Sequence, residues 1–115
     1  MALSQLLDIT ADFNAGGAAT LDISGWDYAV VQLVTPVGTT SFLTSNDAGA
    51  EQGVTDGDAS TATNFVAVSG TVLATAAAAT TLAAAGLIRF EHIGKFLQLT
   101  GTSAAKVLVY LTKIS

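Results

Sequence analysis

The residues with the most obvious potential for chemistry are a single histidine and its acidic neighbour. His92 follows Glu91 in an alternating run that predicts a β-strand. Adjacent side chains of a strand point to opposite faces, so the imidazole and the carboxylate are not expected to pair. His92 therefore lacks the orienting partner of a general base, and we expect a packed or rim histidine. The chain also has no Gly-x-Ser-x-Gly elbow, and we expect no catalytic site and no enzyme.

A polar segment, Ser45 to Thr63, contains four acidic residues whose oxygen atoms could attract a hard cation such as Ca²⁺. They are Asp47, Glu51, Asp56 and Asp58. The Asp56-Gly57-Asp58 triplet lacks the spacing and the terminal bidentate glutamate of a calcium-binding hand. We expect a long solvated surface loop, with no metal and no cofactor, although loops of this length are often functional or ordered by a partner.

Two aromatic residues, Trp26 and Tyr28, follow Gly25 at the predicted start of a strand. Aromatic side chains in this position could stack on sugar rings or anchor an interface. They could equally bury a large area and fix the strand end to the core. The sequence favours the core and leaves sugar binding as the alternative.

The composition is unusual mainly in its shortage of charge. Only 11% of the 115 residues are charged, against about 25% in an ordinary soluble domain. The length predicts one domain, residues 1–115. A surface made of Thr, Ser, Gly and Ala suits burial against neighbouring molecules. The net charge of −5 argues against nucleic-acid binding through phosphate contacts.

Neither secretion nor membrane insertion is predicted. The stretch from Met1 to Asp8 lacks the basic and apolar regions of a secretory signal, so we expect synthesis and assembly in the cytoplasm. The most apolar stretch, Val72 to Phe90, is interrupted by threonines, Gly86 and Arg89, and makes a poor membrane span.

Short runs of β-branched and aromatic residues between Gly, Asn, Asp and Ser predict an all-β fold, an antiparallel, jelly-roll-like β-sandwich of about eight strands. The Ala-rich segment from Ala74 to Ala85 is expected to be extended or irregular rather than helical, because its threonines weaken a helix. The expected strands are Leu3 to Ile9, Ala19 to Ile23, Tyr28 to Thr35, Thr39 to Thr44, Asn64 to Val68, Leu87 to His92, Phe96 to Gly101 and Ala105 to Ile114.

The sequence also predicts a hairpin from Leu87 to Gly101, because a Gly94-Lys95 loop suits a type II′ turn with glycine at the positive-φ position. This register separates apolar from polar residues, which supports it. The expected pairs are Phe90 with Leu99, His92 with Leu97, Glu91 with Gln98 and Arg89 with Thr100.

Two strands, Tyr28 to Thr35 and Ala105 to Ile114, are apolar on both faces. A strand in a two-layer sandwich normally has one face in water, so these strands imply a further covering layer. That layer could be another subunit, or a loop or short helix of the same chain. In the first strand Tyr28, Val30 and Val34 oppose Ala29, Val31 and Leu33, and in the second Val107, Val109 and Leu111 oppose Leu108, Tyr110 and Ile114. The expected interface residues are Trp26, Tyr28, Val30, Val31, Leu33, Leu108, Tyr110 and Ile114.

Several segments occur in a recognisable order along almost the whole chain. They are Gly25-Trp26-Asp27-Tyr28-Ala29-Val30-Val31-Gln32, Ser41-Phe42-Leu43-Thr44-Ser45-Asn46-Asp47, Asn64-Phe65, Leu87-Ile88-Arg89-Phe90 and Gly94-Lys95-Phe96-Leu97-Gln98-Leu99-Thr100-Gly101. In these the chain resembles small proteins encoded among the structural genes of tailed bacteriophages. The resemblance consists of strands and turns, and brings no catalytic residues.

This resemblance implies a non-enzymatic virion component with a jelly-roll or related sandwich fold. The expected role is a capsid decoration or head-associated protein that assembles in the host cytoplasm and then resides on the virion. The expected partners are further copies of the chain, as a trimer suited to the three-fold positions of a capsid lattice, and the major capsid protein or other virion proteins. The alternative is a tail or fibre component that binds a carbohydrate receptor through Trp26, Tyr28 or the loop from Ser45 to Thr63.

Overall fold

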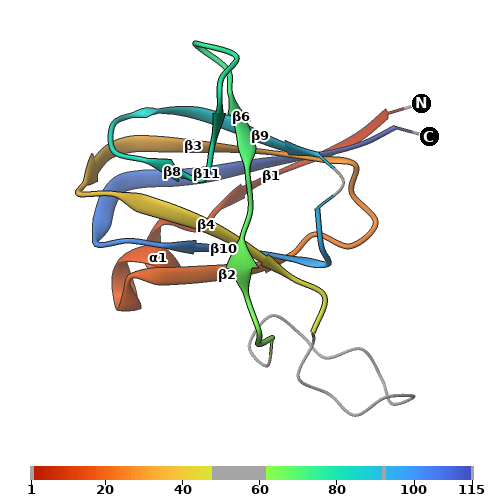
Figure 1. Cartoon of the computed structure of the whole chain (residues 1–115), viewed down its shortest axis with the longest axis horizontal. Coiled ribbons are helices and arrows are strands. Elements are labelled where there is room, and N and C mark those ends of the chain that lie inside the picture. The colour runs from red at the N-terminus through yellow and green to blue at the C-terminus, as the bar shows by residue number, and fades with distance from the viewer. Residues whose placement is uncertain (1, 48–61, 92, 115) are drawn as a thin grey trace.

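The computed structural model describes residues 2–47, 62–91 and 93–114, which form two antiparallel β-sheets packed face to face (Figure 1). The six-stranded sheet has the order β1-β11-β3-β9-β6-β7. Its strands are β1 (Ala2–Asp8), β3 (Tyr28–Val37), β6 (Gly70–Val72), β7 (Ala78–Ala79), β9 (Gly86–Glu91) and β11 (Ser103–Ile114). The predicted all-β sandwich is therefore confirmed, and its jelly-roll connectivity stays a prediction.

The five-stranded sheet has the order β2-β10-β4-β5, with β8 also paired to β4. Its strands are β2 (Ala18–Asp22), β4 (Thr40–Ser45), β5 (Val66–Ala67), β8 (Thr81–Leu82) and β10 (Phe96–Thr100). All eight expected strands exist, some with shifted ends. The Ala-rich segment is extended or irregular, as predicted, and contributes the short strands β7 and β8.

Alternate residues of the long strands form the core between the sheets. Val31 and Leu33 of β3 and Val107 of β11 are fully buried there. Successive side chains of a strand point to opposite faces, so every second side chain points into the core. Phe42 of the five-stranded sheet meets Phe90 of the six-stranded sheet with ring centroids 5.2 Å apart, in a tilted arrangement. Such pairs stabilise a core by about 0.5–1.5 kcal/mol beyond their buried area.

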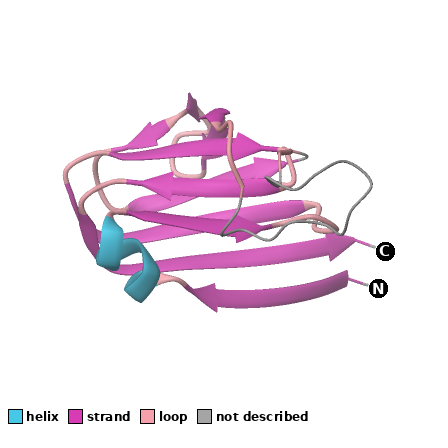
Figure 2. Cartoon of the chain, turned by 90° about the horizontal axis from the view of Figure 1, so that it is seen from below, coloured by secondary structure: helices cyan, strands magenta, loops and turns pink. Residues whose placement is uncertain are grey.

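One short helix, α1 (Thr10–Gly16), was not predicted from the sequence. It packs between β11 and β2 at one end of the sandwich, as Figure 2 shows, and buries Phe13 completely. The helix ends at Gly17, which has φ of 72° and donates its N–H to the carbonyl of Phe13 at 2.8 Å. Glycine adopts this left-handed conformation without the steric cost that a side chain brings.

The predicted hairpin from Leu87 to Gly101 is wrong. Strand β9 pairs with β3 and β6, whereas β10 pairs with β2 and β4, so the two strands belong to different sheets. Thr44 and Asn46 explain the crossing, because they accept hydrogen bonds from the N–H groups of Gly94 at 2.9 Å and Lys95 at 2.8 Å. A glycine is required at position 94 because a Cβ there would lie 2.6 Å from Thr44 Oγ1 and not because of a positive φ.

Candidate interaction surface

The outer face of the six-stranded sheet, turned away from the core, carries a row of apolar side chains across three neighbouring strands. In register, Leu6 lies opposite Tyr110, and Tyr110 lies opposite Val30. Leu6 is 63% exposed and Tyr110 is 45% exposed, while Val30 is half-buried. We call the following outward-facing residues of this sheet the apolar face: Leu6, Tyr28, Val30, Val34, Leu87, Leu108, Tyr110 and Ile114.

The outer face of the five-stranded sheet carries polar side chains where the six-stranded sheet carries apolar ones. On its outer face, Gln98 lies between Thr20 and Leu43, and Thr100 lies between Ala18 and Ser41. The amide of Gln98 donates to Thr20 Oγ1 at 3.1 Å. Polar side chains suit a face in contact with water, and the outer faces of the two sheets therefore differ in polarity at these positions.

The apolar face is hollowed at one end. A depression of about 600 Å³ lies between β3 and the chain around β9, lined by Gln32, Val34, Leu73 and Leu87 among others. Leu73 and Leu87 are both partly exposed there, and the N–H of Leu73 donates to the carbonyl of Leu87 at 3.0 Å. The depression lies beside the row of Leu6, Tyr110 and Val30, and extends the apolar surface toward β9.

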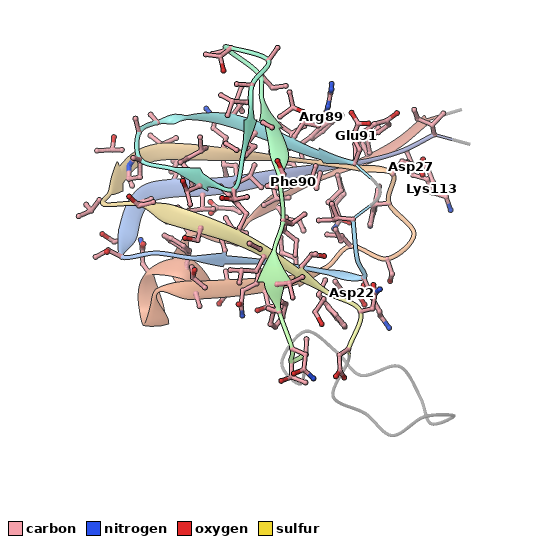
Figure 3. All side chains as sticks on the ribbon, viewed as in Figure 1. Asp22, Asp27, Arg89, Phe90, Glu91 and Lys113 are labelled. Carbon is pink, nitrogen blue, oxygen red and sulfur yellow. The ribbon has the colours of Figure 1, made fainter. Side chains whose placement is uncertain are left out.

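Charges on this side of the sheet balance one another. Arg89 Nε lies 2.9 Å from Glu91 Oε1, and both side chains project outward from β9, opposite to Phe90 (Figure 3). At the other border, the hydroxyl and N–H of Thr10 donate hydrogen bonds to Asp8 and hold the pKa of that carboxyl below its usual value, with a smaller effect of Lys106. Two acidic and two basic residues therefore flank the apolar face among the described positions.

The predicted interface residues fall into two groups. Val31 and Leu33 are 0% and 1% exposed, so the structure corrects their assignment: they pack inside the chain and are closed to a partner. The remaining six are at least partly accessible. Among the described residues no loop or helix was found that buries Tyr110 or Ile114, which are both exposed.

Sequence reasoning missed part of the surface. Leu6 is the most exposed member of the apolar face, and Leu87 and Leu73 border its depression. The signal was present in β1, where Leu3 and Leu6 lie an odd number of positions apart and therefore point to opposite faces. A strand with leucines on both faces repeats the pattern that was recognised in β3 and β11.

Trp26 and Tyr28 border a second, smaller cavity at the end of the sandwich that carries the chain termini. It has a volume of about 310 Å³ and is also lined by Asp27, Lys95 and Phe90. Trp26 is half-buried against the core, and its backbone N–H donates to the carbonyl of Ile23 at 3.1 Å in a turn around Gly25, whose φ is 85°. Asp27 lies near this end (Figure 3) and accepts the N–H of Ile114 at 2.7 Å.

The remaining sequence candidates give no site in the described part of the chain. His92, Glu51, Asp56 and Asp58 lie outside the described residues. Asp47 accepts a hydrogen bond from the amide of Asn64 at 2.7 Å. Across residues 2–47, 62–91 and 93–114 there is no group of three His, Cys, Asp or Glu residues placed to hold a metal ion. No helix in these ranges is both long enough and apolar enough to cross a membrane.

Comparison with known proteins identifies the fold. No known protein family matches the chain, and no curated protein matches its sequence. Among solved structures, the SPBc2 prophage-derived protein YomS is similar, with a TM-score of 0.63 and 12% sequence identity. The similarity covers 100% of this chain and 96% of YomS. At this identity the likeness is one of fold, and the chain therefore has a β-sandwich fold that is also found in a prophage-derived protein.

Proposed function

We propose that this chain is a non-enzymatic structural protein of a tailed-phage particle, a capsid decoration or head-associated protein that works through its apolar face. The single observation that carries the proposal is the row of Leu6, Tyr110 and Val30 on the outer face of the six-stranded sheet. Isolated exposed apolar residues are common on proteins, but a contiguous patch marks an interaction site. The phage context is supported by the sequence resemblance and by the prophage origin of YomS.

The partners in this proposal are further copies of the chain and the proteins of the particle. A charge-balanced apolar face can meet an identical face or a capsid surface without gathering like charges, whereas the chain as a whole carries −5. A trimer is the expected stoichiometry, because it matches the three-fold positions of a capsid lattice.

The first test compares charge insertions on the two outer faces. Tyr110→Lys places a charge in the middle of the apolar face, and Gln98→Lys places the same charge on the polar face of the other sheet. We expect light scattering to give the same oligomer mass for the wild type and for Gln98→Lys, and a lower mass for Tyr110→Lys, which loses the contact through the apolar face. Circular dichroism should show all three folded, because both positions lie outside the core.

The second test concerns the particle. Particles of the phage or prophage that encodes the chain should contain the protein by mass spectrometry, and an electron-microscopy map should place it on the head. A wild-type protein that stays monomeric at micromolar concentration and is absent from purified particles would overturn the proposal.

The cavity beside Trp26 favours a second candidate, a carbohydrate-binding role at a tail or fibre. Its aromatic, acidic and basic lining combines a stacking surface with hydrogen-bonding groups, which is the usual composition of a sugar site. Trp26 is the only tryptophan of the chain, so its fluorescence reports on this cavity directly. A glycan array followed by fluorescence titration tests the role. Binding that Trp26→Ala abolishes would favour it, and an array without hits would remove it.

A further inference from the structure

The N-terminal strand β1 is a free edge of the six-stranded sheet. It pairs with β11 on one side, and the sheet order places no described strand on the other (Figure 2). It has seven residues, whereas the opposite border of the same sheet is β7 with two. An edge strand exposes a row of backbone N–H and C=O groups that can pair with another strand. The longest such row on this sheet therefore belongs to β1.

The hydrogen bonds to β11 determine which backbone groups of β1 remain free. Ile9, one residue beyond the pair of Asp8 with Leu108, donates its N–H to the carbonyl of Val107 at 3.0 Å and so continues the register by one residue. Hydrogen-bonded and non-hydrogen-bonded residues alternate along an antiparallel pair. Leu3, Gln5 and Leu7 therefore turn their backbone groups toward β11. The backbone N–H and C=O groups of the alternate residues lie in the plane of the sheet and point away from β11, toward the free edge. These residues are Ala2, Ser4, Leu6 and Asp8.

This edge lacks the usual protection against pairing. Natural edge strands commonly carry lysine, proline or a bulge, and β1 contains no lysine and no proline. Its leucines are instead exposed on both faces, since Leu3 is 52% exposed on the inner side and Leu6 63% exposed on the outer side. A strand added beside β1 would cover both leucines and satisfy the free backbone groups at once.

We propose that β1 pairs antiparallel with β1 of a second copy, about a two-fold axis that passes through Gln5. This axis places the residues whose backbone groups point to the free edge of one copy opposite the same class of residues in the other copy. It places Ser4 opposite the partner's Leu6, and Leu3 opposite the partner's Leu7. An axis through Gln5 pairs the strand over its whole length, whereas an axis through Ser4 or Leu6 leaves residues at one end without a partner.

The strand is also chemically complementary to itself in this register. Its only charged residue, Asp8, lies opposite the partner's Ala2 and faces no like charge. Leu3 and Leu7 form apolar pairs on the inner face, and the two Gln5 amides meet at the axis, where they can hydrogen-bond. Cross-strand pairs of these kinds contribute roughly 0.2–1 kcal/mol each.

The contact is separate from the phage role, because it holds whether or not the chain belongs to a particle. A two-fold axis of this kind is perpendicular to the sheet, so both copies turn their apolar faces to the same side. The paired sheets then present one continuous apolar surface in which Leu6 of each copy lies near the axis. A particle protein could use that enlarged surface, and the trimer expected on a capsid would be a different contact.

Proline substitution tests the pairing with little risk to the fold. The N–H of Ser4 points out of the sheet, so Ser4→Pro removes a donor that β11 does not use, and proline is accepted at such edge positions. We expect light scattering to give the same mass for the wild type and for the matched control Ser4→Ala. Ser4→Pro should give a lower mass, because the contact between the two β1 strands is lost. An association unchanged in folded Ser4→Pro would overturn the inference.

A cysteine at the axis tests the register and stays informative if Ser4→Pro fails to fold. The chain has no cysteine, so a single introduced thiol can form a disulfide only between copies. Non-hydrogen-bonded partners have Cα atoms about 4.5 Å apart, within the range of about 4.4–6.8 Å of a disulfide. Gln5→Cys should therefore yield a covalent dimer on mild oxidation, and Leu7→Cys should not, because its opposite residue is the partner's Leu3.

The remaining outcomes contradict the inference in distinguishable ways. A covalent dimer from Leu6→Cys but not from Gln5→Cys would place the axis elsewhere and refute the register. A monomeric wild type whose binding to particles is lost in Ser4→Pro would show that a strand of another protein occupies the edge. Failure of Gln5→Cys to cross-link in an oligomer that Tyr110→Lys dissociates would refute the edge contact and leave the proposed function intact.

Discussion

Replacing Asn14 is the sharpest test of how the fold holds β11 in place. The side chain of Asn14 acts as a short substitute for a strand: its Nδ2 donates to the carbonyl of Ala104 at 2.9 Å, and its Oδ1 accepts the N–H of Ala104 at 3.0 Å. Strand β1 has ended before this point, so α1 supplies the partners that a strand would otherwise provide.

Asn14→Ala removes both hydrogen bonds and leaves the backbone groups of Ala104 without a protein partner. A hydrogen bond contributes roughly 1 kcal/mol net, and an unsatisfied buried group costs about 1–3 kcal/mol. Ala104 is only 6% exposed, but Asn14 itself is exposed, so water can reach part of the vacated space. We therefore expect the free energy of unfolding to fall by about 2 kcal/mol.

Urea denaturation followed by circular dichroism measures this change, and hydrogen exchange at the Ala104 amide reports it locally. Ala15→Ser alters an exposed position of the same helix and serves as the control, with an expected change within about 0.5 kcal/mol. Asn14→Asp keeps the acceptor and loses the donor, so its stability should partly recover as the carboxyl is protonated. An Asn14→Ala protein as stable as the control would refute the reasoning that these side-chain bonds hold β11.

Two further predictions concern packing and pH. Gly70→Ala should lower the free energy of unfolding by about 1–3 kcal/mol, because the added Cβ would lie 2.7 Å from a carbon of the buried Phe90 ring. Gly86→Ala is the control: its Cβ would meet nothing within 4 Å, and thermal melts should show no change in stability. Hydrogen bonds from Thr10 lower the pKa of Asp8 in the folded state. They therefore stabilise the protein at pH values above 3.8, the pKa of this carboxyl in the unfolded chain, and the stabilisation is lost as the pH falls through the pKa of the folded state. The stability difference between the wild type and Asp8→Asn should therefore shrink on acidification, and a difference independent of pH between 2 and 7 would contradict this.

The strands were predictable because their signal is local, whereas the partners of the strands were not. The pattern around Gly94 and Lys95 separates apolar from polar residues equally well in a hairpin and in a crossing between sheets. What decides between them is Thr44, which accepts the N–H of Gly94 and donates to the carbonyl of Phe96 at 2.8 Å. A contact between residues fifty positions apart leaves no trace in the periodicity of either strand.

The helix α1 was missed for a related reason. Its seven residues include Thr, Asp, Asn and Gly, which have low helix propensity, and an isolated helix of this length is unstable in water. The helix exists because Phe13 fills the end of the sandwich and Asn14 completes the pairing of β11. Its stability is therefore a property of the tertiary structure.

The candidate surface was half predictable. The period of two correctly placed Tyr28 and Val30 on one face of β3 and Val31 and Leu33 on the other, and the structure confirms that separation. The sequence contains no information on which of two apolar faces meets the second sheet, so both were assigned to an interface. Only the packing of Val31 against the core resolves the choice.

The apolar face and the free edge are explained better by one cause than by two. A solitary protein gains nothing from leucines on both sides of β1, since Leu3 and Leu6 add apolar exposure to a strand that is already open to pairing. Selection for solubility would place lysine there, and the chain has lysine only at positions 95, 106 and 113. A chain that spends its life beside other copies has no such constraint, because its edge and its face are covered after assembly. Under the proposed self-association, the shortage of charge in the sequence, the exposed row on the outer face and the unprotected strand would share one cause.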